Sequence, residues 1–134
     1  MTLIEAQTLY RSTGYSKLCN TSGLPFKTLY ELSKIASEIS AAVRFYESKY
    51  QALVAEYADK DDKGKPVTMI KDGKGYFNIT DPEAMAKCLS RKRDLDFVDA
   101  DIDITPVKLT EEQIDTIGLT VEEFNQVQSI ISVE

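Results

Sequence analysis

The stretch PFKTLYELSKIASEISAAVRFYESKYQALVAEYA, residues 25–58, decides the fold of this chain. Its apolar residues recur at alternating intervals of three and four, which is the spacing of a helix face buried against another helix. No glycine or further proline occurs between Pro25 and Gly64. The sequence therefore predicts one long helix whose apolar face carries Leu29, Leu32, Ala36, Ile39, Val43, Tyr46, Tyr50, Leu53 and Tyr57.

The length of this helix bears on assembly. At a rise of about 1.5 Å per residue it would extend roughly 50 Å. A compact globule of 134 residues has a diameter of only about 36 Å, so either the fold is elongated or a second subunit covers the overhang. Additional apolar residues at Ile35, Ala42 and Phe45 widen the buried face beyond a two-helix contact. We therefore expect a homo-oligomer with contact residues Leu29, Leu32, Ala36, Ile39, Val43, Tyr46 and Tyr50.

The residues before the long helix predict one short helix and a loop. Thr2 and Glu5 have the spacing of a capping box, which favours a helix from Leu3 to about Ser12. Gly14 is expected to end this helix. The polar residues 15–23 are then expected to form a loop that leads back to the long helix.

A β-hairpin is expected after the long helix. The runs Val67–Ile70 and Tyr76–Ile79 are rich in β-formers and flank an Asp-Gly turn within residues 71–75. A phosphate-binding loop at 71–75 is the weaker alternative, because Walker spacing is absent. The preceding Asp59–Pro66 is expected to be a charged turn and not a calcium loop, because its acidic residues lack EF-hand spacing.

Asp81-Pro82 is an N-cap followed by proline at the first helical position, which predicts a helix to about Lys92. The side chains of this helix that we expect to face inward are Met85, Cys88 and Leu89.

Apolar and acidic residues then alternate along Phe97–Val107. This period of two predicts a half-buried strand that completes a small antiparallel sheet with the hairpin. Its outer face would carry Asp99, Asp101 and Asp103, a row that could bind a divalent ion or imitate a phosphate backbone. More often such a row keeps an exposed sheet face in water and protects its edge.

Two capped helices are expected at the C-terminus. Thr110–Ile117 is followed by Gly118, and a second helix runs from Val121 to about Ile131. An amphipathic terminal helix either docks on its own domain or contacts a neighbour, and the Gly-Leu-Thr hinge at Gly118 favours the neighbour slightly. The expected contact residues are Phe124, Val127, Ile130 and Ile131.

Together these elements predict an α+β fold in a single domain over residues 1–134. Its helical part would be 1–58, its hairpin, helix and strand 59–107, and its C-terminal helical segment 108–134. A chain of this length with 43% hydrophobic residues can bury one modest core.

Composition argues against several classes of function. The net charge is −6, and the densest basic cluster, Arg91–Arg93, is followed at once by acidic residues, so no nucleic-acid partner is expected. Histidine is absent, and Cys19 (expected exposed) and Cys88 (expected buried) lack CxxC spacing. We therefore predict no catalytic, cofactor-binding or metal-binding residues and no enzymatic activity. No signal peptide or membrane-spanning run is seen, so no membrane partner is expected.

The order and spacing of several short stretches resembles a family of short uncharacterised proteins of temperate phages of Gram-positive bacteria. The stretches are Leu24–Leu32, Phe45–Tyr50, Lys60–Gly64, Val98–Val107 and Gly118–Thr120. The resemblance implies a virion or assembly component of the head, neck or tail region. The alternative is an intracellular phage protein that inhibits a host defence by binding. Either would act on itself or on other phage or host proteins, in the host cytoplasm or the virion, and the family assigns no catalytic residues.

Overall fold

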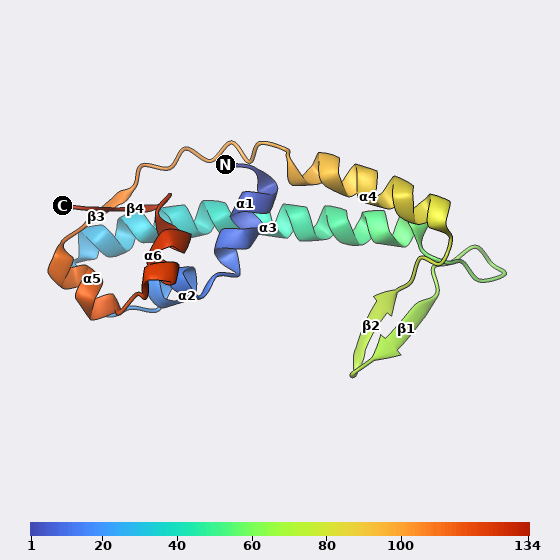
Figure 1. Cartoon of the computed structure of the whole chain (residues 1–134), viewed down its shortest axis with the longest axis horizontal. Helices are drawn as coiled ribbons and strands as arrows, with labels where there is room; N and C mark the ends of the chain where they lie inside the picture. Colours follow the sequence, from blue (N-terminus) through green and yellow to red (C-terminus); the bar gives the residue numbers. More distant parts are fainter.

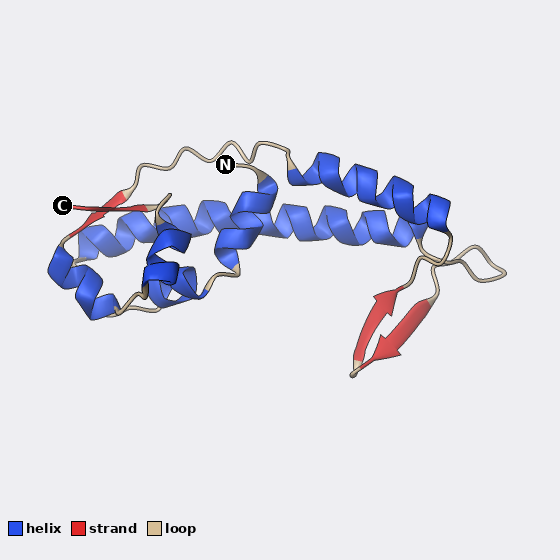
Figure 2. Cartoon of the chain, viewed as in Figure 1, coloured by secondary structure: helices blue, strands red, loops and turns tan.

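The computed structural model describes residues 1–134 and has the α+β composition that the sequence predicts (Figures 1 and 2). A capping box of Thr2 and Glu5 starts α1, as predicted, and Asp81 caps α4. In chain order the elements are α1 (Leu3–Tyr10), α2 (Thr13–Cys19), α3 (Phe26–Tyr57), β1 (Thr68–Lys71), β2 (Lys74–Phe77), α4 (Pro82–Asp96), β3 (Val107–Leu109), α5 (Glu111–Ile117), α6 (Val121–Val127) and β4 (Ile131–Val133).

The predicted long helix is α3, and it forms the long axis of an elongated molecule (Figure 1). The core lies at its N-terminal half, where α1, α2, α5, α6 and the β3–β4 pair gather. The C-terminal half of α3 is covered by α4, which lies alongside it. An elongated fold thus accounts for the length of α3. The core residues are Leu9, Tyr15, Leu18, Leu24, Leu32, Ile35, Ile39, Val43, Val107, Leu109, Ile117, Val127, Ile130 and Ile131.

The expected loop over residues 15–23 is wrong for its first part, which is helical in α2. The Ser12 hydroxyl caps this helix by accepting a hydrogen bond from the Tyr15 amide, and burial of Tyr15 and Leu18 holds it on the core. Gly14 does not end a helix but lies inside α2. A Cβ atom there would lie 2.4 Å from the Glu123 carbonyl oxygen, so glycine permits the close approach of α2 and α6.

The predicted hairpin is confirmed as β1 and β2, an antiparallel pair in which Thr68 lies opposite Phe77 and Lys71 opposite Lys74. Asp72 and Gly73 have φ angles of 53° and 76°, the left-handed values that a tight two-residue turn requires. The preceding segment is a charged turn, as expected. The Asp61 carboxylate accepts hydrogen bonds from the backbone amides of Lys63 and Lys65.

The predicted third strand is wrong, because residues 98–106 belong to no sheet and do not meet the hairpin. Asp101 has a φ of 52°, and its amide donates to the Asp99 carboxylate, so the backbone bends in the middle of the alternating run. Pro106 lacks the N–H that a ladder would use. The alternation itself persists, since Ala100, Ile102 and Ile104 are partly buried and the aspartates are exposed.

The second of the two expected C-terminal helices also differs from the prediction, which placed its end at about Ile131. α6 ends at Val127, and Ile131 begins β4, which pairs in parallel with β3 in the register Val107 to Ile131. α5 and α6 form the crossover between the two strands, which a parallel pair requires. The β-branched residues Ile130, just before β4, and Ile131, its first residue, are thus buried outside any helix.

α4 continues beyond the expected end at Lys92 to Asp96. Of its three expected inward residues only Cys88 is buried. Met85 and Leu89 are exposed, because α4 packs on α3 and α1 only, and these two neighbours leave the rest of its surface uncovered.

Candidate interaction surfaces

The helix face predicted to bind a partner is used inside the chain. Leu32, Ile39, Val43 and Tyr46 are buried, and Ala36 and Tyr50 are partly buried, against α1, α4 and the C-terminal elements. Among the predicted contact residues of α3, only Leu29 is exposed, with 36% of its surface accessible. Most of this face therefore packs within the monomer, and Leu29 is its exposed member.

Polar contacts fix α4 on the C-terminal half of α3. The Tyr46 hydroxyl donates a hydrogen bond of 2.6 Å to the Asp96 carboxylate, which also accepts one of 2.9 Å from Lys92. The Tyr46 and Tyr50 rings are stacked, and the Lys92 ammonium lies 5.7 Å from the centre of the Tyr50 ring. Burial raises the pKa of Tyr46, and Asp96 raises the pKa of Lys92, so both groups keep their protons at neutral pH.

The C-terminal residues predicted to contact a neighbour are also internal. Val127, Ile130 and Ile131 are buried in the core, and Phe124 packs against it with partial exposure. The sequence left open whether this segment docks on its own domain or contacts a neighbour. In the structure it docks on its own domain. The residues dock there because α6 is shorter than predicted and the residues that follow it lead into β4.

An ion pair joins the C-terminal unit, which consists of β3, α5, α6 and β4, to α2. The Lys17 ammonium lies 2.7 Å from the Glu123 carboxylate, which also accepts a hydrogen bond of 3.0 Å from the Thr120 amide. Lys17 and then the Thr120 amide lower the pKa of Glu123 to about 2. The Gly14 amide adds a hydrogen bond of 2.9 Å to the side chain of Gln126. The C-terminal unit is therefore docked by polar as well as apolar contacts.

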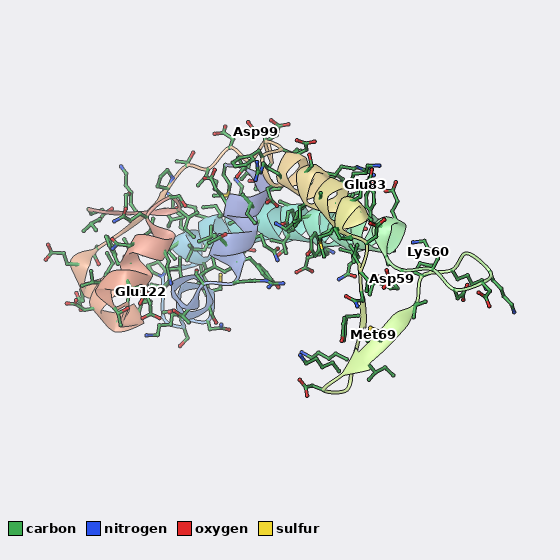
Figure 3. The ribbon with its side chains drawn as sticks, turned by 45° about the vertical axis from the view of Figure 1, so that its right-hand side comes forward. Asp59, Lys60, Met69, Glu83, Asp99 and Glu122 are labelled. Carbon is green, nitrogen blue, oxygen red and sulfur yellow. The ribbon has the colours of Figure 1, made fainter.

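The hairpin is an arm that stands off the body at the end opposite to the core (Figures 1 and 3). Its base is fixed: the Thr80 amide and hydroxyl both donate to the Asp59 carboxylate, at 3.0 and 2.9 Å. The Lys60 ammonium donates to three carbonyl oxygens at the C-terminal end of α3, where the helix dipole favours a cation. In Figure 3, Asp59 and Lys60 lie at the base of the arm, and Met69 lies farther out along it.

Both faces of this arm are exposed. β1 is exposed along its whole length, and in β2 only Phe77 is partly buried. The exposed apolar side chains include Met69, Ile70 and Tyr76, and Ile70 keeps 80% of its surface accessible. None of these residues is among the contact residues that the sequence predicts. The adjacent pairs Met69-Ile70 and Tyr76-Phe77 were an available signal, since neighbouring apolar residues in a strand lie on opposite faces.

A second unpartnered feature is the extended segment 98–106. Its start is tied to the N-terminus, where the Leu3 amide donates to the Val98 carbonyl and the Ala100 amide to that of Met1. Residues 102–105 neither donate nor accept a backbone hydrogen bond. The aspartate row that the sequence singled out is exposed along this segment, with Asp99 at the edge of the molecule in Figure 3.

A groove lies between this segment and α3. It has a volume of about 420 Å³, and its apolar lining includes Ala41, Ala42 and Phe45. Phe45 is 49% exposed and is not part of the internal face of α3. The acidic residues that line the groove are Glu38, Asp99 and Asp101, and no basic residue does so.

The cysteines behave as the sequence predicts in their placement: Cys19 is exposed, Cys88 is buried, and neither is in a disulfide. Burial raises the pKa of the Cys19 thiol, which makes its thiolate scarce at neutral pH. No group of three or more cysteine, aspartate or glutamate side chains is arranged to hold a metal ion. None of the helices combines the length and hydropathy that crossing a bilayer requires.

No protein-family model matches the chain, and neither a curated protein nor a solved structure shows significant similarity to it.

Proposed function

We propose that this chain is a non-enzymatic bacteriophage protein that acts through protein–protein contacts, as a virion or assembly component of the head, neck or tail region. It works as a homo-oligomer, in the host cytoplasm and in the particle. The assignment to phages rests on the sequence resemblance over Leu24–Ile131.

The main support for a role in protein–protein contacts is the exposure of the β1–β2 arm. An isolated two-stranded hairpin is only marginally stable in water, and this one has no third strand and no helix packed on either face. Its exposed Met69, Ile70 and Tyr76 leave apolar surface in solvent. Exposed apolar groups on a projecting element are typical of a contact with another molecule.

The chemistry of the chain supports a role without catalysis. Cys19, the exposed potential nucleophile, has a raised thiol pKa. The strongest polar constellations, Tyr46 with Asp96 and Lys17 with Glu123, connect structural elements to one another. These groups are thus engaged in holding the fold.

Two variants of phage carrying the encoding gene test this proposal. Ile70→Asp places a carboxylate on the arm, and Val121→Asp makes the same kind of change at an equally exposed site, since the two residues are 80% and 82% accessible. Quantitative mass spectrometry of purified particles should find the wild-type chain at fixed stoichiometry. Ile70→Asp should lower the yield of complete particles, and Val121→Asp should not. A chain absent from particles would overturn the virion role, and equal yields for both variants would overturn the proposal as a whole.

The alternative, an inhibitor of a host defence protein, is favoured by one observation. Asp99, Asp101 and Asp103 are exposed along one segment of a chain with a net charge of −6, an arrangement able to imitate a phosphate backbone. This role predicts a chain confined to the host cytoplasm and absent from particles. It also predicts that duplex DNA competes with the wild-type chain for the host target. The double variant Asp99→Asn, Asp103→Asn should no longer bind that target.

A further inference from the structure

We propose that the β1–β2 hairpin of one copy adds to the extended segment 102–105 of a second copy and forms an intermolecular three-stranded sheet. The inference rests on the proposed function in that it takes the hairpin as a contact element. It goes further by naming the partner as another copy of this chain and by naming the surface on which the hairpin docks.

The backbone of residues 102–105 is open to a strand. The segment is extended, its side chains alternate between partly buried and exposed, and its amides and carbonyls make no backbone hydrogen bond. It lies between a stretch tied to the N-terminus at Val98 and Ala100 and the start of β3 at Val107. These four residues have side chains that alternate as in a strand, and no neighbouring strand hydrogen-bonds to their backbone. They therefore form a sheet edge of the kind that a strand from another chain can extend.

The hairpin supplies a matching edge. β1 and β2 are four residues each, and each is paired on one side only. Their free edges are therefore as long as the open edge of residues 102–105. Antiparallel or parallel addition would satisfy backbone groups that now face solvent on both chains.

Side-chain facing agrees with this pairing. In the hairpin, Ile70 lies on one face, and Lys71 and Lys74 lie on the other, together with Met69 and Tyr76. In the open segment, Ile104 faces the body with partial burial, and Asp103 faces outward. If the hairpin pairs with the segment so that Ile70 faces the body of the second copy, Ile70 lies next to Ile104. The same arrangement places Lys71 and Lys74 beside Asp103.

The charges of the two surfaces are complementary. Lys71 and Lys74 lie directly opposite each other, a like-charge pair that destabilises an isolated hairpin. The groove of about 420 Å³ beside the segment is lined by three carboxylates, by no lysine or arginine, and by apolar side chains that include Phe45. A wider groove of about 810 Å³, with charges of both signs, continues along Asp103 and Thr105, so a strand has space on the side of the segment that faces α3.

A chain cannot make this contact with itself. The hairpin projects from one end of the molecule, whereas residues 102–105 lie along the half of α3 that carries the core (Figure 1). The contact is therefore between two different surfaces of two copies. A head-to-tail series of such contacts closes into a ring when the rotation between copies allows it and otherwise continues as an open filament, whereas two copies related by a two-fold axis exchange hairpins in a closed dimer. We expect one of the two closed forms.

Sedimentation velocity with a charge-swap series tests this inference. The series compares wild type, Lys71→Glu, Asp103→Lys, the double variant and the control Lys63→Glu. Lys63 lies in the neighbouring exposed turn, so its variant makes the same charge change outside the arm. Circular dichroism melting checks that each variant keeps the wild-type fold, as expected, because no altered residue is in the core.

Wild type should form an assembly of defined size at about 100 μM. Each single variant should weaken association about tenfold, the equivalent of one lost charge pair. The double variant should recover wild-type assembly, and Lys63→Glu should match wild type. A monomeric wild type overturns the inference, as does an assembly that the single variants leave intact or the double variant fails to restore. A monomer found in phage particles at fixed stoichiometry would refute the self-contact and the homo-oligomer, and it would leave the proposed role as a virion component that contacts other proteins standing.

Discussion

Replacement of Ile130 by alanine tests whether the C-terminal segment belongs to the core of its own chain. Ile130 is 1% exposed, next to the parallel β3–β4 pair, and its carbonyl accepts the Val107 amide at 2.9 Å. The substitution removes three carbon atoms, worth roughly 0.8 kcal/mol each in transfer free energy. The cavity left behind adds to this, so the free energy of unfolding should fall by about 3 kcal/mol.

Urea unfolding followed by circular dichroism measures this loss. With an m-value of about 2 kcal/mol/M, the midpoint should fall by about 1.5 M. Val121→Ala is the matched control, because Val121 is in the same C-terminal unit but 82% exposed, and its cost should stay within about 0.5 kcal/mol. Measurements at two protein concentrations separate the monomer contribution from any contribution of assembly. A loss for Ile130→Ala no larger than that of the control would refute the internal role of this residue.

The remaining predictions concern stability. Gly14→Ala should destabilise by about 1–3 kcal/mol in thermal melting, because the new Cβ would lie 2.4 Å from the Glu123 carbonyl oxygen; a raised melting temperature would contradict this close approach. The pKa of Glu123 is lowered to about 2 by Lys17, so its contribution to stability is present above the unfolded pKa of about 4.3 and lost as the pH falls toward 2. Urea midpoints between pH 5 and 2 should therefore fall less steeply in Glu123→Gln than in wild type, and equal slopes would argue against the pair. Tyr46→Phe removes the 2.6 Å hydrogen bond to Asp96 and should cost about 1.5–3 kcal/mol in urea unfolding, whereas a neutral result would show that this bond does not hold α4 in place.

Local signals account for the elements that the sequence predicted well. The three-four spacing of apolar residues defined α3, and the Asp-Gly turn defined the hairpin. Side-chain caps at Thr2, Asp81 and Thr110 marked the helix starts. Each of these signals lies within a few residues of sequence, where propensity and hydrogen bonding act without tertiary help.

The expectations that failed depended on contacts between distant residues. Gly14 belongs to a helix because Glu123 lies against it, more than a hundred residues later. Ile131 pairs with Val107, so a helical-looking stretch ends in a strand. The apolar face of α3 was correctly identified as buried. Its spacing could not reveal that α1, α4 and the C-terminal unit, and not a second chain, cover it.

The candidate site was the least predictable part, for the same reason. Ile70 and Phe45 became candidates only when the structure left them exposed. The alternation over Phe97–Val107 predicted a strand in a sheet with the hairpin, and the monomer provides the alternation without the sheet. Pairing between copies would supply the missing strand neighbour.

Zero-length cross-linking of an equal mixture of isotopically heavy and light chains tests whether the hairpin of one copy contacts residues 102–105 of another. The reagent joins a lysine amine to a carboxylate only when the two are in contact. We expect cross-linked peptides that join Lys71 or Lys74 to Asp103 and that occur as heavy-light hybrids, because the two residues come from different copies. Hybrids without these pairs, or these pairs in single-label peptides only, would contradict it.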